Sequence, residues 1–560
     1  MSRPGPATVT MTLFHKGNGP LTKRIRLDKN GHVVSDGSAC IMGAGTAERV
    51  RLDGVHDLAA LIDACTDRDA LGLGALRPDL PDRCAITIKR KLVNGTARPD
   101  LIARTADAIR YAPQQPAYVL FDADAKGIPP EVAARIRSYG GIWRTLITVL
   151  PALANIARVR RLSTSAGLYR DDTGEDLSVP GRHIYGLVRD GADIERFLAA
   201  LHQRLWLAGL GWFVIGAGGQ LLERSIIDRM VGASERLVFE GPPVLEPPLA
   251  QHRDRRRPEI RDGEALDTIA GCPSLSIVEQ AKFRELRAKA SRFLAPAIAA
   301  ARKAFVGMQV SALVARAGIS RKPAEKIAAM QCRGVLLPHL ILPFDDDGLA
   351  GATVADVLAD PARFDGETLA DPLEGVEYGR GKARIMLRAD GTPWIHSFAH
   401  GRTTYHLRHD AEAVRQVIKA APKDDVVNVF VRAVLDAEIE ADALQELIGL
   451  VAARSKVGKI PIKQALKAAQ KERQREHARE ERRRLLAERS DPRPQLPVPC
   501  ADEPYVPQME SLNEVLAAAR DPVPPSRDID GDNNRPKLRR LPRFHLLATS
   551  SANPEDNTDG

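Results

Sequence analysis

Cysteine is scarce in this sequence of 560 residues, and no two cysteines stand close together. The absence of any C-x-x-C pair argues against a zinc ribbon built from thiolates and against a disulfide scaffold. We therefore expect reduced, mostly buried thiols, as in a cytosolic protein. The six cysteines are Cys40, Cys65, Cys84, Cys272, Cys332 and Cys500.

Long hydrophobic runs are also missing. The longest, residues 205–219, is shorter than the roughly 18 residues that a membrane span needs, and glycines interrupt it. The first ten residues contain no apolar stretch of the signal-peptide type. We therefore expect a soluble, cytoplasmic protein without a membrane partner.

No phosphate-binding loop of the type G-x-x-x-x-G-K-[ST] is present. Residues 375–383 come nearest, but the spacing differs and Ala383 stands where the motif requires Ser or Thr. A helicase motor that works with this chain would therefore be a separate protein. Internal repeats of 20–50 residues are absent as well.

The overall composition is that of a globular protein, with 44% hydrophobic and 27% charged residues. A net charge of +9 is modest for this length, so a basic surface has to be argued from local clusters. The length predicts two to four domains.

Over the first 250 residues, predicted strands alternate with predicted helices. Residues 8–52 alternate in the manner of strands, whereas 55–67 and 99–112 show apolar residues at helical spacing. The segment 130–141 begins at a proline and ends at glycines, which is typical of a helix. Strands are expected at 182–190 and 236–241. The pattern predicts an α/β or α+β domain with one main sheet, and we favour an α+β fold in which that sheet is mixed.

Changes of composition divide the chain further. A segment rich in proline and arginine at 241–263 reads as a boundary or surface loop, and the last 70 residues have the composition of a disordered tail. The predicted domains are 1–255 (catalytic), 270–335 (helical, helix-turn-helix-like), 336–412 (small and β-rich), 413–490 (helical, ending in a charged helix) and 491–560 (tail).

The stretch "YVLFDADAKGIPP", residues 118–130, is an apolar strand that runs into two aspartates. Residues i and i+2 of a strand point to the same face, so Asp122 and Asp124 project together, with Cα atoms roughly 6.5–7 Å apart. Two carboxylates at that spacing favour a hard divalent cation such as Mg²⁺ or Mn²⁺. Taken alone, the pattern is equally compatible with an Asp-rich turn at the end of a strand.

Two later segments carry polar residues in a similar setting. Gly181, Arg182 and His183 lead into a strand, and Asp228 is flanked by the arginines Arg224, Arg229 and Arg236. The order is therefore an Asp-x-Asp strand, a strand that begins at a histidine, and a third acid among arginines.

This order resembles the archaeo-eukaryotic primase superfamily, in particular the primase-polymerases of bacterial mobile elements. Those enzymes carry a D-x-D motif, an S-x-H motif and a third aspartate. The resemblance covers roughly residues 1–250. It implies that Asp122, Asp124 and Asp228 bind the divalent metals and that His183 contacts the phosphates of the incoming nucleotide.

The sequence departs from the family pattern at one position, because Gly181 stands where the serine of S-x-H is expected. A hydroxyl contact is then lost or is supplied by Ser163 or Ser165. Glu223 or Glu235 could replace Asp228 as the third ligand. The expected nucleotide-binding residues are His183, Ser165, Arg182, Arg229 and Arg236.

A second informative region spans residues 368–410. Residues 381–398 predict a hairpin around an Asp-Gly turn. Its cationic and aromatic residues favour contact with single-stranded nucleic acid, although the aromatics could instead form the core of a small domain. The expected nucleic-acid-binding residues are Lys382, Arg384, Trp394 and Arg402. A metal site could also be formed by His396, His400, His406 and His409, although no cysteine is nearby in the sequence to complete a zinc site.

We therefore expect a DNA primase-polymerase that makes or extends primers on a single-stranded DNA template, using NTPs or dNTPs with Mg²⁺ or Mn²⁺, for mobile-element replication. A non-catalytic nucleic-acid-binding scaffold derived from a primase is the alternative. A metal-dependent nuclease using the same carboxylates is a weaker one. Residues 310–329, with Gly318 in the turn and Ser320 as a cap, resemble a helix-turn-helix.

Overall fold

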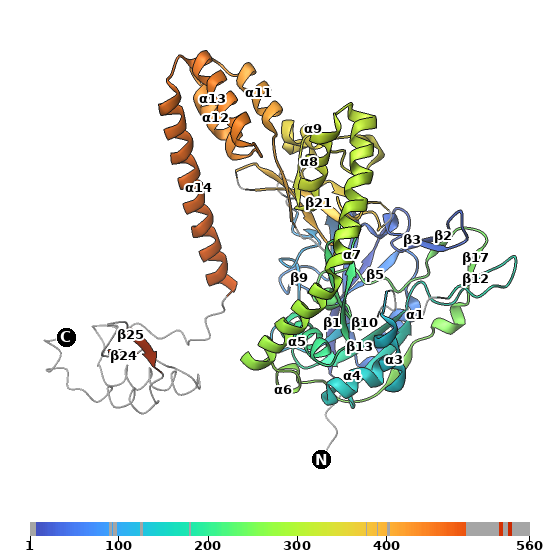
Figure 1. Ribbon diagram of the computed structural model, residues 1–560. Helices are drawn as coiled ribbons and strands as arrows, with labels where there is room; N and C mark the ends of the chain where they lie inside the picture. Colours follow the sequence, from blue (N-terminus) through green and yellow to red (C-terminus); the bar gives the residue numbers. More distant parts are fainter. Residues whose placement is uncertain are drawn as a thin grey trace. The chain divides into compact units, whose positions relative to one another are not determined.

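The computed structural model describes residues 7–88, 92, 98–123, 127–178, 181–376, 378–388, 390–399, 404–488, 526–529 and 536–539. The chain forms two compact units (Figure 1). Unit 1 comprises Met1–Ala420 and Asp436–Leu444, and unit 2 comprises Ala421–Leu435 and Gln445–Gly560. Helices and strands are mixed, and the sheets contain both parallel and antiparallel pairs, in agreement with the expected mixture of α and β structure.

Two sheets, rather than the one main sheet expected from the sequence, form the N-terminal part of unit 1. The first has the strand order β5-β1-β4-β7-β8 and the second the order β10-β13-β11-β18. The first sheet consists of β5 (Asp69–Gly72), β1 (Thr8–His15), β4 (Gly45–Asp53), β7 (Arg83–Thr87) and β8 (Leu101–Ala103). The second consists of β10 (Ala117–Ala123), β13 (Arg182–Val188), β11 (Arg158–Leu162) and β18 (Glu259–Arg261).

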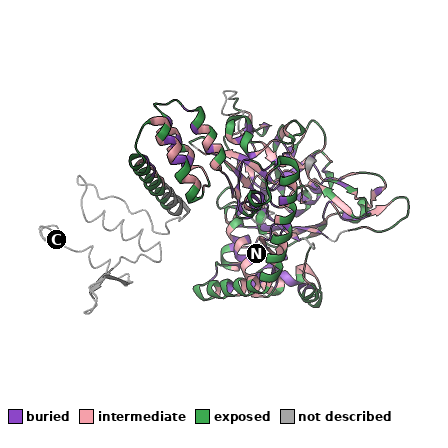
Figure 2. Ribbon diagram, turned by 45° about the horizontal axis from the view of Figure 1, so that its top comes forward, coloured by how far each residue is buried: buried purple, intermediate pink, exposed green. Residues whose placement is uncertain are grey.

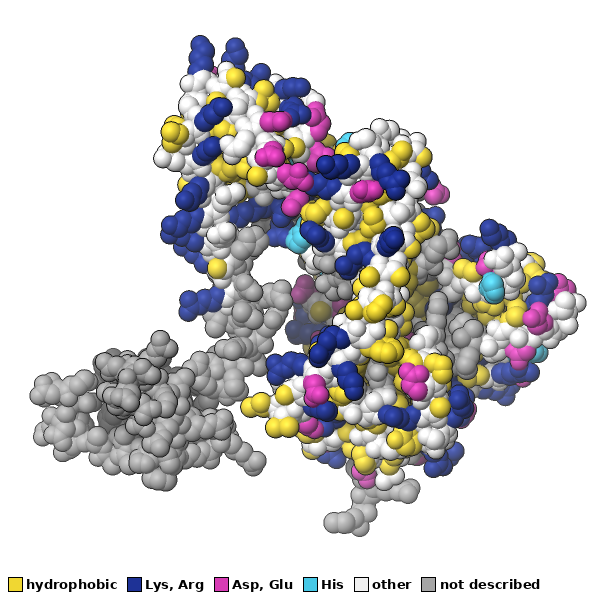
Figure 3. Space-filling view, viewed as in Figure 1, with side chains coloured by type: hydrophobic (Ala, Val, Ile, Leu, Met, Phe, Trp, Pro, Cys, Tyr) yellow, Lys and Arg dark blue, Asp and Glu magenta, His cyan; other side chains and the backbone are white. Residues whose placement is uncertain are grey.

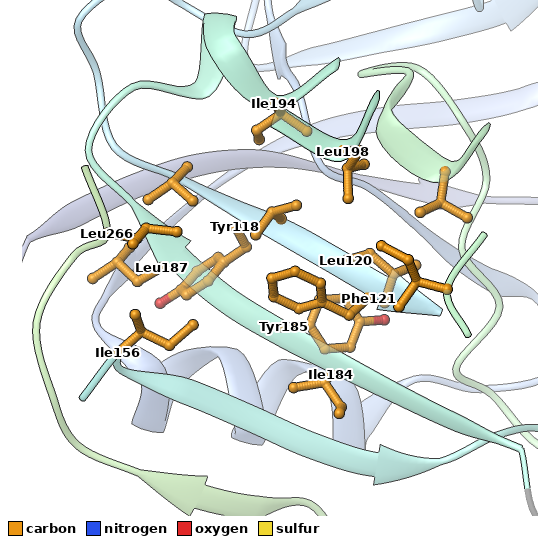
Figure 4. Close-up of a cluster of buried hydrophobic side chains, with 14 of the residues drawn as sticks. Tyr118, Leu120, Phe121, Ile156, Ile184, Tyr185, Leu187, Ile194, Leu198 and Leu266 are labelled. Carbon is orange, nitrogen blue, oxygen red and sulfur yellow. The ribbon is translucent and has the colours of Figure 1, made fainter. Parts of the chain in front are cut away.

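Both sheets contribute to one hydrophobic cluster, which also takes side chains from several helices. Figure 4 shows its centre, where Phe121 of β10 and Tyr185 of β13 lie among aliphatic side chains. Burial on both faces explains why β10 reads as a continuous apolar run rather than an alternating one. The contributing helices are α1 (Val55–Ala64), α3 (Pro130–Ser138), α4 (Ile142–Val149) and α5 (Ile194–Leu207), and the short helix α6 (Thr268–Gly271) lies between the cluster residues Leu266 and Cys272 in the sequence.

Smaller elements connect these layers. The three-stranded sheet β16-β2-β3 and the pairs β12-β17, β14-β15 and β6-β9 lie in this part of the chain. Their bounds are β2 (Arg24–Leu27), β3 (Val33–Asp36), β6 (Ala75–Leu76), β9 (Ile109–Arg110), β12 (Leu168–Arg170), β14 (Gly211–Ile215), β15 (Leu221–Ser225), β16 (Val244–Leu245) and β17 (Leu249–Gln251). The 3₁₀ turns are η1 (Ser38–Cys40), η2 (Pro151–Leu153), η3 (Gly191–Asp193), η4 (Arg229–Gly232) and η5 (Arg253–Arg256).

Three expectations from the sequence are wrong in this part. The segment 99–112 contains β8 and β9 instead of a helix, because Leu101–Ala103 pairs in parallel with β7. The segment 236–241 is not a regular strand and makes only one isolated bridge, from Val238 to Leu71. The segment 241–263 is not a boundary, since β18 pairs with β11, so residue 255 falls inside this part of the fold.

A long helix, α7 (Ile277–Ala317), follows and is joined to α8 (Arg321–Cys332) at Gly318, whose φ of 61° is left-handed. This geometry agrees with the predicted helix–turn–helix arrangement, although Ser320 makes no side-chain capping hydrogen bond. Hydrophobic side chains run along much of α7 (Figure 3). It is the one helix among the described residues with the length and composition to cross a membrane, and 17% of its most apolar window is buried. A single helix of this kind is weak evidence for a membrane protein.

The β-rich module expected at 336–412 is a five-stranded sheet with the order β19-β23-β22-β21-β20. The predicted hairpin is confirmed, since β21 pairs antiparallel with β22. The buried face of this sheet packs in a hydrophobic cluster that also includes residues of α7 and α8. The elements are β19 (Val335–Leu336), η6 (Asp347–Leu349), α9 (Val354–Ala359), α10 (Pro361–Phe364), β20 (Thr368–Leu369), β21 (Ala383–Leu387), β22 (Pro393–Ser397), β23 (Thr404–Leu407) and α11 (Ala411–Ala420).

Unit 2 is built around helices. They are α12 (Val426–Leu435), most of α13 (Ala441–Ser455) and α14 (Lys459–Glu488). The buried residues Phe430, Ile448 and Ile462 come from all three helices, whereas most of α14 is exposed (Figure 2). The predicted tail, 491–560, lies outside the described residues except for β24 (Ser526–Ile529) and β25 (Pro536–Arg539), which pair antiparallel.

Candidate active site

Asp122 and His183 lie directly opposite each other on neighbouring strands. The antiparallel register of β10 and β13 pairs Asp122 with His183, so both side chains point to the same face of the sheet. His183 Nε2 lies 3.8 Å from Asp122 Oδ1. The next strand, β11, places Arg161 opposite His183. An acid, an imidazole and a guanidinium therefore form one row across three strands.

Asp228 is brought to the same end of β10 from a distant part of the sequence. Its backbone N–H donates a 2.9 Å hydrogen bond to the backbone oxygen of Asp122. Asp228 Oδ1 accepts from the Met230 N–H at 2.8 Å and caps η4, while Oδ2 lies 3.8 Å from Arg236 Nη2. The two acids of the proposed site are thus neighbours through their backbones.

Asp124, the second aspartate of the Asp-x-Asp motif, lies outside the described residues. Within the described part of the chain, no group of three or more His, Cys, Asp or Glu side chains is arranged to hold a metal ion. The described donors are carboxylates, the oxygen ligands that Mg²⁺ and Mn²⁺ prefer. The donor chemistry of the residues present therefore fits such an ion, and Asp122 and Asp228 are the described acids of the expected set.

The other acids considered for the third position have different surroundings. Glu223 accepts from His202 Nε2 at 2.8 Å and pairs with Arg287 at 2.7 Å. Glu235 lies beside Ser234, whose Oγ is 3.2 Å from Glu235 Oε2. Neither is joined to β10 by the backbone contact that Asp228 makes.

A buried carboxylate, Glu240, lies behind His183. Its Oε1 accepts from His183 Nδ1 and from Tyr185 Oη, each at 2.5 Å. Arg161 and Arg256 approach its Oε2 at 3.7 and 4.0 Å. Glu240 is fully buried and the two arginines are 7% and 2% exposed. One carboxylate thus balances a histidine and two guanidinium groups in the interior.

This environment sets the charge of His183. Burial by itself lowers the pKa of His183, but the charge and hydrogen bond of Glu240, together with the charge of Asp122, outweigh it and raise the pKa above its ordinary value. Burial would raise the pKa of Glu240, yet the same partners hold it below its usual range. Both shifts favour an imidazolium paired with a carboxylate, so the surroundings stabilise the positively charged form of His183 beside Asp122.

The sequence gives little indication that Glu240 and the two arginines lie behind His183. Glu240 ends an apolar segment, and a single acid there reads as a turn residue. Arg161 belongs to the basic-looking segment 158–161, which a sequence pattern assigns to the surface. Only alternation in β11, where Arg161 shares a face with buried Val159, could have indicated an inward-pointing arginine.

The departure at Gly181 has a local structural explanation. A Cβ atom on residue 181 would lie 2.5 Å from Ser163 Oγ and 3.1 Å from Ser163 Cβ. The buried Ser163 side chain therefore fills the space that a side chain at position 181 would need. Ser163 Oγ is also 3.4 Å from Ser165 Oγ. Of the two serines that could supply the missing hydroxyl, Ser163 is the one in contact with Gly181.

Exchange of these two residues is a direct test. Gly181→Ala is expected to cost about 1–3 kcal/mol of folding free energy, because it overpacks against Ser163. Combining Gly181→Ser with Ser163→Gly should recover most of that loss, since one hydroxyl again occupies the space. Urea denaturation of the variants measures both effects. A Gly181→Ala protein as stable as the parent would contradict the packing explanation.

The arginines expected to bind nucleotide separate in the structure. Arg236 lies beside Asp228, while Arg229 is exposed and its charge acts on Glu223 instead. Arg182 alternates with His183 along β13, so its side chain leaves from the opposite face of the sheet. Arg236 is therefore the arginine best placed for an anion at the acids.

In the β-rich module, one face of the sheet carries the residues expected to bind nucleic acid. Arg384 lies opposite His396, and Trp394 follows on the same face, away from the buried Ile385 and Ile395. The ring centroids of Trp394 and His396 are 5.8 Å apart, and those of His396 and Phe398 are 4.8 Å apart. Trp394 is thus not part of the module's core.

Other residues of this module have different surroundings. Tyr405 is a core residue, fully buried, and its hydroxyl donates to Asp371. Arg402 and His400 lie outside the described residues. Burial and then the charge of Arg384 lower the pKa of His396, which favours its neutral form. No metal-binding group of His residues forms in the described part of this module.

Comparisons of the chain with protein-family models, with curated proteins and with solved structures find no match.

Proposed function

We propose that this chain is a DNA primase-polymerase of the archaeo-eukaryotic type, which makes or extends primers on single-stranded DNA during the replication of a mobile element. The observation that supports it most is the gathering of Asp122, His183 and Asp228 at one end of β10. Three segments far apart in the sequence supply these residues, in the order that the family motifs predict. A primase-like catalytic core in unit 1 is part of this proposal.

In this proposal, the aspartates and His183 have separate roles in nucleotidyl transfer. The carboxylates of Asp122 and Asp228 would hold Mg²⁺ or Mn²⁺, together with Asp124. The chemistry that such an ion supplies when bound is activation of the attacking 3′-hydroxyl and neutralisation of the leaving pyrophosphate. His183, held protonated by Glu240, would donate a charge-assisted hydrogen bond to a phosphate oxygen.

The fixed orientation of His183 matters for that task. Its Nδ1–H is committed to Glu240, so Nε2 is the nitrogen that faces Asp122 and the nucleotide side. Because the supporting carboxylate is buried, the imidazolium is oriented before the substrate arrives. Preorganised donors of this kind lower the cost of stabilising a phosphoryl transition state.

A primer-synthesis assay tests the proposal. The purified chain is incubated with single-stranded DNA, labelled NTPs or dNTPs, and Mg²⁺ or Mn²⁺, and products are separated by length. Products longer than the starting primer, or new primers, support the polymerase. Binding of DNA without incorporation would favour the non-catalytic scaffold, and shortening of the template would indicate a nuclease.

The aromatic face of the β-rich module is expected to stack on template bases. Trp394→Ala should weaken binding of a single-stranded oligonucleotide about 10-fold, because stacking of one base contributes about 1–3 kcal/mol. The slope of affinity against salt concentration should stay unchanged, since no phosphate contact is lost. Fluorescence anisotropy at several salt concentrations measures both quantities.

The exposed aromatic Phe293 on α7, 84% accessible, provides the matched control. Phe293→Ala should leave DNA affinity unchanged. Equal affinities for the Trp394 and Phe293 variants would remove the β-rich module from the template-binding surface.

A further inference from the structure

The face of the second sheet that is turned away from the candidate active site carries a group of arginines. Side chains alternate along β11, so Arg158 and Arg160 leave from the face opposite to that of Arg161. On the adjacent strand β18, Arg261 lies directly opposite Arg158. Glu259 lies opposite Arg160 in the same way. Three guanidinium groups and one carboxylate therefore share this face.

These four side chains line a small surface hollow together with Trp143 of α4 and Ile184 of β13. The cavity volume is about 40 Å³, which is room for a group the size of a few water molecules. This volume suits a single oxyanion group better than a nucleobase or a sugar.

Trp143 holds Arg158 in position at the wall of the hollow. The Arg158 Cζ atom lies 4.5 Å from the centre of the Trp143 ring, which is a cation–π distance. Arg158 Nη1 also donates a 3.3 Å hydrogen bond to the backbone oxygen of Ile156. The Trp143 ring packs edge-on against Phe121 of the core, with 6.0 Å between the ring centroids. The guanidinium group of Arg158 is therefore oriented before a ligand arrives.

The positive charges of the hollow are not balanced. Glu259 forms an ion pair with Arg160. Arg261 is exposed, and within the described residues no carboxylate lies at ion-pairing distance from Arg261 or Arg158. Like charges directly opposite each other on neighbouring strands destabilise a sheet. Burial lowers the pKa of Arg158, and the charges of Arg261 and Arg160 lower it further. The lining therefore favours an anion.

We propose that this hollow is a phosphate-binding site, in which Arg158, Arg160 and Arg261 hold one phosphate group on the face of the sheet opposite to the candidate active site. Guanidinium groups bind phosphate oxygens through pairs of parallel hydrogen bonds, and the tetrahedral arrangement of these oxygens lets arginines from two strands share one phosphate. The phosphate belongs either to a nucleic-acid strand that crosses this face or to a free phosphate compound. The inference does not depend on the proposed function, because the two sites lie on opposite faces of the sheet.

Calorimetry with the full-length chain, in the absence of divalent metal ions, measures the binding of inorganic phosphate. Arg261→Gln should weaken this binding about 10- to 100-fold, as expected for the loss of one charged hydrogen-bonding group. Glu259→Gln should tighten it about 3- to 10-fold, because a competing negative charge is removed from the hollow. Arg292→Gln, which changes an exposed arginine on α7, is the matched control and should leave the affinity unchanged. Equal affinities in all four proteins would overturn the proposal.

The melting temperature separates phosphate binding from a role in the fold. Without ligand, Arg261→Gln should melt at the same temperature as the parent or higher, because the repulsion between Arg261 and Arg158 is relieved. Tighter binding by Glu259→Gln is a gain that damage to the fold does not produce. Weaker binding in both variants, together with lower melting temperatures, would assign these residues to the fold and overturn the proposal.

A single-stranded oligonucleotide identifies the source of the phosphate. If a strand supplies it, Arg261→Gln should weaken oligonucleotide binding as well and reduce the slope of log affinity against log salt concentration by about one. Weaker binding of inorganic phosphate with unchanged oligonucleotide binding identifies a free phosphate compound. Either result supports the site.

The primer-synthesis assay separates this inference from the proposed function. Phosphate binding that depends on Arg261, in a protein that incorporates no nucleotide, supports the site and removes the polymerase. Nucleotide incorporation by a protein whose phosphate binding does not depend on Arg261 supports the polymerase and overturns the inference alone.

Discussion

Replacing Asp122 and Asp228 by asparagine is expected to reduce nucleotide incorporation by about 10²–10³-fold for each single variant, a loss typical for removing one group that stabilises transition-state charge. Asparagine keeps the shape and one oxygen but loses the negative charge that a divalent cation requires. The Asp228 side chain also caps η4, and asparagine can still accept the hydrogen bond from Met230. The fold should therefore survive.

Asp190 is the matched control for the cap. Its Oδ1 accepts from the Ala192 N–H at 2.9 Å and caps η3 in the same way as Asp228 caps η4. Asp190→Asn should leave incorporation unchanged. Primer extension, circular dichroism and DNA binding are measured on all variants. Full activity of Asp122→Asn would remove the catalytic assignment, and a comparable loss in Asp190→Asn would attribute the effect to the fold.

The effect of the two acids is not expected to be additive. Because both would hold the same ions, the first substitution already removes most of the function, and the double variant should be little worse than either single one. The two aspartates of the Asp-x-Asp motif, Asp122 and Asp124, should show the same non-additive loss of nucleotide incorporation when both are changed to alanine. A simple sum of the free-energy losses would indicate two independent sites.

Local patterns predicted the elements that carry these residues. The apolar run of β10, the strand after Gly181 and the helix that begins at Pro130 all follow from short-range chemistry. The prediction of a helix at 99–112 is wrong. The apolar spacing of this segment fits a helix, but Leu101–Ala103 pairs with β7 and therefore forms a strand. Long-range pairing of that kind is not visible in a local pattern.

The sequence predicted those residues of the candidate site that lie at the ends of strands. Asp122 and His183 were expected to be important, but their opposition across two strands depends on register. Lys382, expected to bind nucleic acid, follows a turn at Gly381 that packs against Ile41, which no sequence pattern indicates. Glu240 was missed for a similar reason, since its partners are defined only by burial.

Glu240→Ala is expected to cause the largest loss of folding stability, about 3–5 kcal/mol. Arg161 and Arg256 are almost completely buried, and the substitution leaves their charges without the central carboxylate. Glu240→Gln should cost less, because its amide oxygen can still accept from Tyr185. Urea denaturation at neutral pH measures the free energy of unfolding.

An exposed ion pair serves as the control for the stability prediction at Glu240. Glu259 pairs with Arg160 at the edge of the same sheet, with side chains 62% and 38% exposed. Glu259→Gln should change stability by no more than about 1 kcal/mol, since water screens such pairs. Similar losses for the Glu240 and Glu259 variants would contradict the view that Glu240 organises a buried network.

The pairing of His183 with Glu240 should also make the folding stability depend on pH. Because the pKa of His183 is raised in the folded protein, its pairing contributes stability that is complete below about pH 6.5 and is lost as the pH rises through the raised value. The lowered pKa of Glu240 contributes stability that is present above about pH 4.5 and is lost as the pH falls through the lowered value. Stability should therefore be greatest between these limits.

In Glu240→Gln the partner charge is gone and burial dominates, so the pKa of His183 should fall below 6.5. The loss of stability above pH 6.5 should then disappear, and binding of a nucleoside triphosphate should weaken at neutral pH as His183 becomes neutral. NMR titration of the His183 ring in both proteins measures the shift. An unchanged His183 pKa would show that Glu240 does not set its charge, and the phosphate-binding role of the imidazolium would lose its physical basis.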